Sequence, residues 1–274
     1  MRLSVRHETT YRYATPALSV IQHLRLSPRG HNGLFVRRWR VEIDADCRLE
    51  RGEDAFGNIT HTFTAEGPLD QVKIIVDGDV ETTDTHGVLA GTLERFPLVF
   101  WQRETDLTHA SPEITEFARD IAGGEGGDRL ATLHAINAAL FSTMRFSIGD
   151  THAATQAGEA FAARAGVCQD FAHVFLAAAR LLDIPARYIG GYYLRTDMNE
   201  QEAGHAWVEA HVDGIGWIGF DPAHGVSVTD RYVRVASGLD YLDAAPIRGA
   251  RQGGGGEAMS VAVHVAEGPA VIDD

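Results

Sequence analysis

The period of the hydrophobic pattern changes near residue 110, and this change limits the fold more than any other feature of the sequence. Before it, apolar and polar residues alternate in short runs, clearest at residues 9–13, 24–27, 36–43 and 73–76. Turn residues separate the runs, as at Pro28-Arg29-Gly30 and Asp77-Gly78. Such alternation is typical of strands with one buried face. Residues 1–95 are therefore predicted to form an N-terminal β-sandwich domain.

Beyond residue 110 the pattern favours helices first and strands afterwards. Ser111 and Asp128 are helix-capping residues, and the second helix would bury a stripe of Leu130, Leu133, Ile136, Leu140 and Phe141. Further helices are predicted at residues 157–164 and 168–182, and strands at 188–194, 205–212 and 217–221. This order predicts an α+β core over residues 96–250, with helices packed on an antiparallel sheet. Residues 251–274 are predicted to be a glycine linker and a last strand that can pair with either domain.

Composition and charge exclude several classes of protein. The 274 residues carry a formal net charge of −14, which makes nucleic acid a poor partner. No apolar run reaches the roughly eighteen residues of a membrane span, and the N-terminus lacks the apolar core of a secretion signal. We therefore expect a cytoplasmic protein without membrane contact. Two cysteines, Cys47 and Cys168, are too few for a disulfide framework or a Cys-rich zinc site.

Cys168 lies in a context that favours reactivity. It opens the strongest predicted helix, directly after Gly166-Val167. A helix N-terminus presents free N–H groups and a partial positive charge, which favour the thiolate over the thiol. The same N–H groups can hold a developing oxyanion. A cysteine that merely fills a gap in the core is the alternative for an isolated residue of this type.

A thiolate nucleophile needs a base and a group that orients the base, and a predicted hairpin supplies candidates for both. His205 begins one strand and Asp221 ends the next, with Asp213-Gly214 between the strands. A loop with an odd number of residues puts both side chains on one face as diagonal neighbours, whereas an even loop puts them on opposite faces. We therefore predict a three-residue loop at 213–215, or a bulge.

Three segments together resemble the core motifs of the bacterial transglutaminase-like superfamily. They are residues 166–173 (GVCQDFAH), 205–209 (HAWVE) and 216–222 (GWIGFDP). Residues 184–188 (IPARY) and 190–192 (GGY) resemble the link that follows the cysteine helix in that family. Residues 10–13 (TYRY), 24–29 (LRLSPR) and 56–58 (FGN) resemble the β domain that precedes the core in one bacterial subgroup.

The resemblance implies a papain-like core with a Cys-His-Asp triad and no cofactor or metal. Cys168 would be the nucleophile, His205 the general base and acid, and Asp221 the residue that orients the imidazole. Trp207 and Gln169 are weaker candidates for substrate or oxyanion contacts. The sequence departs from the family at residues 222–225, where Pro-Ala-His-Gly replaces the more usual Pro-Thr-Asn-Gly.

The function expected from this resemblance is thiol-dependent acyl transfer or amide hydrolysis through a thioester, on a peptide or protein substrate. Hydrolysis is favoured because nothing in the sequence marks an amine site. The alternative is a non-catalytic protein-binding scaffold that retains the fold. A GxGxxG match at residues 214–219 lies inside the predicted hairpin and opens no helix, so it does not predict a dinucleotide site. A metal site assembled from Cys168, His173, His205 and His224 lacks a second clustered pair. The oligomeric state stays open.

Overall fold

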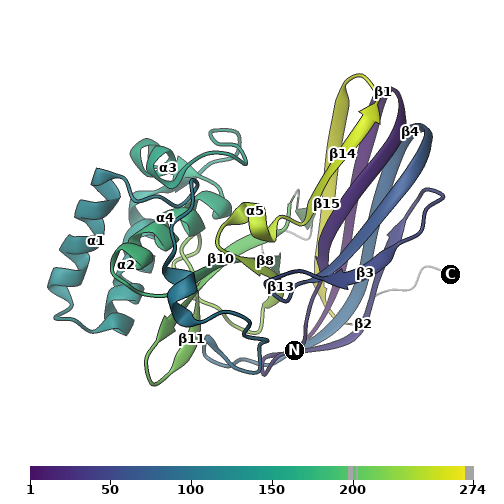
Figure 1. The fold of residues 1–274 in the computed structure, drawn as a ribbon. Coiled ribbons are helices and arrows are strands. Elements are labelled where there is room, and N and C mark those ends of the chain that lie inside the picture. The colour runs from purple at the N-terminus through teal and green to yellow at the C-terminus, as the bar shows by residue number, and fades with distance from the viewer. Residues whose placement is uncertain (197–199, 202, 269–274) are drawn as a thin grey trace.

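The computed structural model describes residues 1–196, 200, 201 and 203–268 and contains two antiparallel sheets and a helical layer (Figure 1). The helices are η1 (Leu98–Gln102), α1 (Pro112–Gly124), α2 (Arg129–Thr143), α3 (Ala157–Ala163), α4 (Cys168–Leu181) and α5 (Tyr241–Ala244). No helix within these described ranges is long and apolar enough to cross a membrane.

The N-terminal sheet is built around two long strands that pair along most of their length. It contains β1 (Arg2–Ser27), β2 (Leu34–Ile43), β3 (Glu50–Glu53), β4 (Ile59–Thr82), β9 (Glu200–Gln201), β14 (Ile247–Gly253) and β15 (Glu257–Glu267), in the order β2-β4-β1-β15-β9, with β14 paired to β1 and β3 to β4. Hydrogen bonds connect all seven strands into one sheet. The expected division into two sheets of a sandwich is therefore not found among the described residues.

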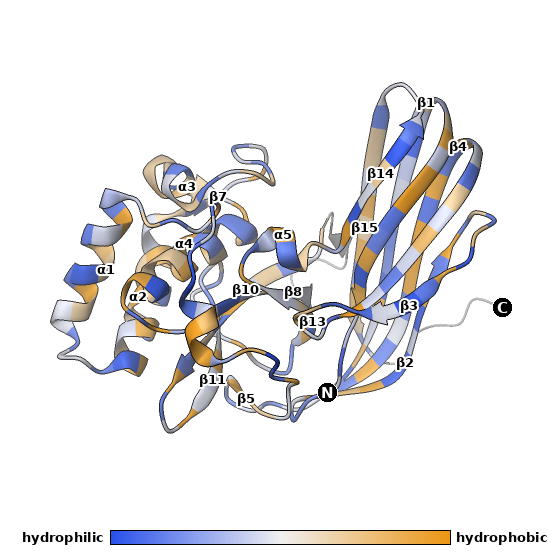
Figure 2. Ribbon diagram, viewed as in Figure 1, coloured by the Kyte–Doolittle hydropathy of each residue, from blue (hydrophilic) through white to orange (hydrophobic). Residues whose placement is uncertain are grey.

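Alternating side chains give this sheet its two faces (Figure 2). Leu3, Val5 and His7 of β1 are buried, whereas Arg2 and Arg6, which alternate with them along the strand, are exposed. Arginines of β2 form ion pairs with carboxylates of β4, as Arg37 does with Glu81 at 3.0 Å and Arg38 with Asp77. Positive side chains on this sheet thus have counter-charges on the neighbouring strand.

The C-terminal strand pairs with the N-terminal domain. β14 lies against residues 17–24 of β1, and β15 lies against residues 3–13 of the same strand. The glycine-rich segment between β14 and β15 lies where the regular pairing with β1 is interrupted. Gly253, Gly254 and Gly256 have positive φ values there, and the Ala14 N–H donates to the Gly255 carbonyl at 2.9 Å. The glycine-rich segment is therefore an irregular stretch of the sheet edge.

The second sheet carries the helices. It contains β5 (Val88–Leu89), β8 (Ala186–Tyr193), β10 (His205–Val212), β11 (Gly216–Asp221), β12 (Val226–Ser227) and β13 (Tyr232–Gly238), in the order β12-β11-β10-β8-β13, with β5 paired to β11. Helix α4 packs on β10 and β8 and is surrounded by α1, α2 and α3. A parallel pair, β6 (Arg145–Phe146) and β7 (Ala165–Gly166), leads the chain into α4.

Most predicted helix ends are confirmed by their caps. Ser111 Oγ accepts the Ile114 N–H at 3.3 Å, and Asp128 Oδ1 accepts the Leu130 N–H at 2.9 Å. The predicted apolar stripe of α2 is wrong at one position. Phe141 is 53% exposed because it lies in the last turn, at the margin of the helical layer, whereas Leu133 and Leu140 are fully buried.

The two domains share one core. Leu3, Val5 and Val265 of the N-terminal sheet belong to the same buried cluster as Phe175 of α4. The Asn58 side chain, from the sequence motif FGN, completes the contact: its Nδ2 donates to the Ser237 carbonyl at 2.8 Å, and its Oδ1 accepts the Ser237 N–H at 2.8 Å. The Asn58 side chain thus bonds both backbone groups of Ser237, as a neighbouring strand does in a sheet, and it links the start of β4 to β13 of the second sheet.

Candidate active site

Cys168 is the first residue of α4, and hydrogen bonds to the Asp170 side chain fix the turn that precedes it. Asp170 Oδ2 accepts the Val167 N–H at 2.7 Å and the Thr151 hydroxyl at 2.6 Å. A Cβ on Gly166 would lie 2.5 Å from that same carboxylate oxygen, so only glycine fits there. Cys168 is therefore held in the first turn of α4, at the N-terminal end of the helix.

The hairpin loop has the length that the site requires. Strand β10 ends at Val212 and β11 begins at Gly216, and Val208 pairs with Phe220. The predicted three-residue loop is thereby confirmed. In this register Asp221 lies opposite Trp207 and diagonal to His205, on the same face. His205 Nε2 and Asp221 Oδ2 are 2.7 Å apart.

Asp221 accepts hydrogen bonds from five donors although it is fully buried. Its Oδ2 accepts from His205 Nε2 at 2.7 Å, His224 Nδ1 at 2.8 Å and the Tyr232 hydroxyl at 2.7 Å. Its Oδ1 accepts the N–H groups of Ala223 and His224 at 3.0 and 3.2 Å. Burial opposes ionisation, but the His205 and His224 contacts outweigh it and hold the pKa of Asp221 well below its usual range. The carboxylate is therefore charged at neutral pH.

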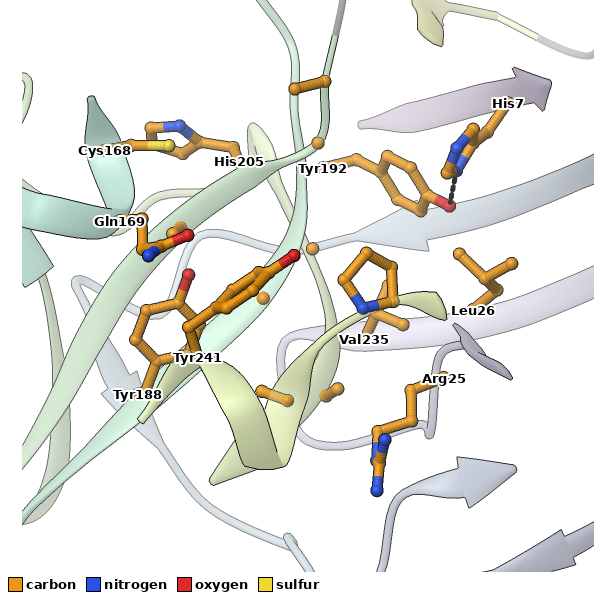
Figure 3. Close-up of a pocket in the computed structure, with 18 of the residues that line it drawn as sticks. His7, Arg25, Leu26, Cys168, Gln169, Tyr188, Tyr192, His205, Val235 and Tyr241 are labelled. Atoms are coloured by element: carbon orange, nitrogen blue, oxygen red, sulfur yellow. Dashed lines mark hydrogen bonds between the residues drawn. The ribbon is translucent and has the colours of Figure 1, made fainter. Parts of the chain in front are cut away.

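The charge of Asp221 sets the protonation of His205. Burial disfavours the imidazolium, but the Asp221 carboxylate, its hydrogen bond and a further hydrogen bond to Cys168 outweigh that effect and raise the pKa of His205 to about 10. Because Nε2 is committed to Asp221, the ring nitrogen left for Cys168 is Nδ1. The sulfur of Cys168 lies beside the imidazole ring in Figure 3.

A cavity of about 220 Å³ opens at Cys168 and His205. It lies between the N-terminus of α4, helix α5, the edge of the second sheet and strand β1 of the N-terminal domain (Figure 3). A small molecule or a side chain can thus reach the sulfur from this side.

The two weaker candidates occupy different places. Gln169 lines the cavity, and its Nε2 donates to the Ala153 carbonyl at 3.3 Å. Trp207 does not line it, because its side chain is buried beneath Tyr232, with ring centroids 5.3 Å apart and a T-shaped arrangement. Trp207 therefore packs against His205 and Tyr232 in the core, and it is not among the residues that line the cavity.

Sequence reasoning missed Tyr232 and the role of His224. Tyr232 comes from β13, and no motif links it to Asp221. His224 lies where the sequence departs from the usual Pro-Thr-Asn-Gly, and that departure was the available signal. The ligand atoms of His205, Asp221 and His224 lie within 4.8 Å of one another. His205 Nε2 and His224 Nδ1 both hydrogen-bond to Asp221 Oδ2. The three side chains are therefore held together by their own hydrogen bonds.

Family models match both parts of the chain. Residues 115–222 match the transglutaminase-like superfamily core, and residues 3–81 match the bacterial transglutaminase-like N-terminal region. The chain belongs to the transglutaminase-like superfamily. The core match contains Cys168, His205 and Asp221, so the resemblance noted in the sequence is confirmed.

Relatives and solved structures agree with this membership. An uncharacterised protein of Mycobacterium leprae is 29% identical over 96% of this chain and 98% of its own, and one of Mycobacterium tuberculosis is 29% identical over 90% of this chain and 87% of its own. The crystal structure of a candidate cysteine protease from Cytophaga hutchinsonii superposes with a TM-score of 0.79 at 20% identity, covering 100% of this chain and 94% of the other. At this identity the superposition establishes a shared transglutaminase-like fold.

Proposed function

We propose that the chain is a thiol-dependent amidase or acyltransferase that acts on a peptide or protein through a thioester on Cys168. The observation that carries this proposal is the position of His205, whose ring bonds Asp221 through Nε2 and contacts Cys168 on its other side. A cysteine, a base and an orienting carboxylate in this order are the parts that nucleophilic acyl transfer requires.

The first half-reaction forms the thioester. The Cys168 thiolate attacks the carbonyl carbon of the substrate amide, so that a C–S bond forms and the carbonyl electrons move to oxygen. The free N–H of Cys168 at the helix N-terminus can donate to that oxyanion. The imidazolium of His205 then protonates the amide nitrogen, the C–N bond breaks, and ammonia or an amine leaves.

The second half-reaction returns the enzyme to its starting state. Neutral His205 accepts a proton from water or from an acceptor amine as that molecule attacks the thioester carbonyl. A C–O or C–N bond forms, the C–S bond breaks, and the thiolate leaves beside a newly protonated imidazole. Asp221 keeps its charge throughout and stabilises the imidazolium. We favour water as the acceptor.

The proposal predicts that Cys168 reacts with iodoacetamide much faster than Cys47. Both thiols are partly buried, so exposure alone does not separate them. Burial and the neighbouring Asp46 raise the pKa of Cys47, whereas Cys168 has a helix N-terminus and an imidazolium beside it. At about pH 6 we expect Cys168 to be alkylated at least roughly tenfold faster.

Peptide mass mapping after timed labelling of the folded protein measures both rates at once. Labelling in denaturant is the control, because both cysteines should then react alike. Equal rates in the folded protein would contradict the proposed activation of Cys168.

A further inference from the structure

The cavity beside Cys168 has two ends that come from different domains. Cys168, Gln169 and Tyr188 line one end, and His7 and Leu26 of β1 line the other. In Figure 3 Leu26 lies on the opposite side of the cavity from the sulfur. The N-terminal domain thus forms a wall of the candidate active site.

Among the described residues, the far end offers a ligand mainly apolar surface. His7 Nδ1 is 2.9 Å from the Tyr192 hydroxyl, and His7 Nε2 is 2.9 Å from the Thr9 hydroxyl, so the polar atoms of this wall are used up among themselves. Burial lowers the pKa of His7 to about 4, which leaves the ring neutral. Arg25 also lines the cavity, but its guanidinium points away from it in Figure 3, where Nε donates to Asp54 at 2.7 Å and Nη1 is buried without a partner among the described residues. The remaining surface here is that of Leu26, Val235 and Pro246.

The near end is different, because two phenol groups there are free to bond a ligand. Tyr188 and Tyr241 line the cavity close to Cys168, and no hydrogen bond of either hydroxyl is found within the described part of the chain. The pKa of Tyr188 is raised well above its usual value, first by burial and then by the adjacent Cys168. These hydroxyls can donate to the carbonyl or accept from the N–H of a substrate main chain.

We propose that this cavity is an acyl-side specificity pocket that takes one large apolar side chain, aromatic or branched aliphatic, on the residue whose carbonyl is attacked. The inference rests on the proposed function, because it places that carbonyl at Cys168. A volume of about 220 Å³ exceeds the roughly 150 Å³ of an engineered apolar cavity that binds benzene, so it holds one such side chain. An acidic or basic side chain would lose its hydration at the far end without gaining a partner.

Selective labelling of the full chain tests this substrate class without a known substrate. The probes are N-acetyl aminoacyl chloromethyl ketones with phenylalanine, leucine, glycine and glutamate side chains. In each, the Cys168 sulfur displaces chloride, so a C–S bond replaces the C–Cl bond. We expect the phenylalanine and leucine probes to label Cys168 roughly 30-fold faster than the glycine probe, from the burial of apolar surface, and the glutamate probe to be slowest.

A variant that fills the pocket tests its location. A Cβ on Gly190 would meet only Ala244 O at 3.5 Å and a Tyr188 carbon at 4.0 Å, so Gly190→Val is tolerated and projects into the cavity. It should lower the ratio of phenylalanine to glycine labelling about tenfold. Gly123→Val is the matched control, because a Cβ there meets nothing within 4 Å, and it should keep the wild-type ratio.

The outcomes separate the pocket from the chemistry. Iodoacetamide labelling of Cys168 no faster than of Cys47 would overturn the proposed function itself. Fast iodoacetamide labelling with equal rates for all four ketones, or with the glutamate probe fastest, would overturn the pocket while leaving the function standing. Since the wild-type panel needs no variant, the inference can be refuted even if Gly190→Val fails to fold.

Discussion

Replacing Cys168 by alanine is expected to lower the rate of amide cleavage by about 10⁴-fold or more, while the protein stays folded. Cys168 is the one thiol among the described residues that line the cavity, and losing the nucleophile of a catalytic unit costs about as much as losing the whole unit. The change removes one sulfur atom from a partly buried position, so thermal unfolding should shift little.

The measurement is release of ammonia or of a new amine from a panel of peptides that contain glutamine, or phenylalanine or leucine on the acyl side of the cleaved amide, with and without an added primary amine. The amine separates transfer from hydrolysis, because it changes the product but leaves thioester formation in place. Cys47→Ala is the matched control and should keep full activity, since Cys47 lies in the N-terminal domain and pairs with Ala65. Unchanged turnover in the Cys168 variant would favour the scaffold alternative.

Glu209→Gln is expected to destabilise the fold by about 3 kcal/mol, the largest stability effect that we anticipate from a single isosteric change. Glu209 is 2% exposed, and its carboxylate bonds Arg187 Nε at 2.6 Å and Arg234 Nε at 2.8 Å. The variant leaves both guanidinium groups without this charge, and among the described carboxylates Glu94 is the one that remains beside Arg187, at 3.0 Å. Arg187 also lies over the Trp217 ring at 3.9 Å, so the disturbance reaches the strand that ends in Asp221.

Urea unfolding at about pH 7 measures this loss, with Glu81→Gln as the control. Glu81 has a 3.0 Å ion pair with Arg37, but both side chains are more than 40% exposed, so we expect a loss under about 1 kcal/mol. Burial opposes ionisation of Glu209, but Arg234 and Arg187 lower its pKa to about 2. Its contribution is therefore present above the unfolded value of about 4.3 and is lost as the pH falls through about 2. Equal losses in the two variants would contradict this account.

Local patterns predicted the part of the site that depends on strand register. His205 and Asp221 are sixteen residues apart in one hairpin, so the parity of a short loop decides whether they share a face. Cys168 was predictable for a similar reason, because a helix start is marked by local residues. The three-residue loop at 213–215 that the sequence predicts is the loop found in the structure, and it places His205 and Asp221 on the same face.

Contacts between distant segments could not be predicted in this way. Tyr232 reaches Asp221 from another strand, and β15 pairs with β1 across more than 240 residues of chain. Strand pairing at such separation depends on the burial of whole faces, and no local residue type marks it. The single N-terminal sheet and the wall that β1 contributes to the cavity follow from these long-range pairings.

The central claim is that a thiolate at Cys168 is paired with an imidazolium at His205, held by Asp221. The most direct measurement is the ultraviolet difference spectrum between the wild-type protein and Cys168→Ala as the pH is varied, with Asp221→Asn as a third sample. We predict that the difference spectrum shows a thiolate band at neutral pH, accompanied by a protonated His205 that persists until the pH approaches about 10, and that this band is weaker in Asp221→Asn. A spectrum without a thiolate band at neutral pH, or with a band that is unchanged in Asp221→Asn, would contradict the account.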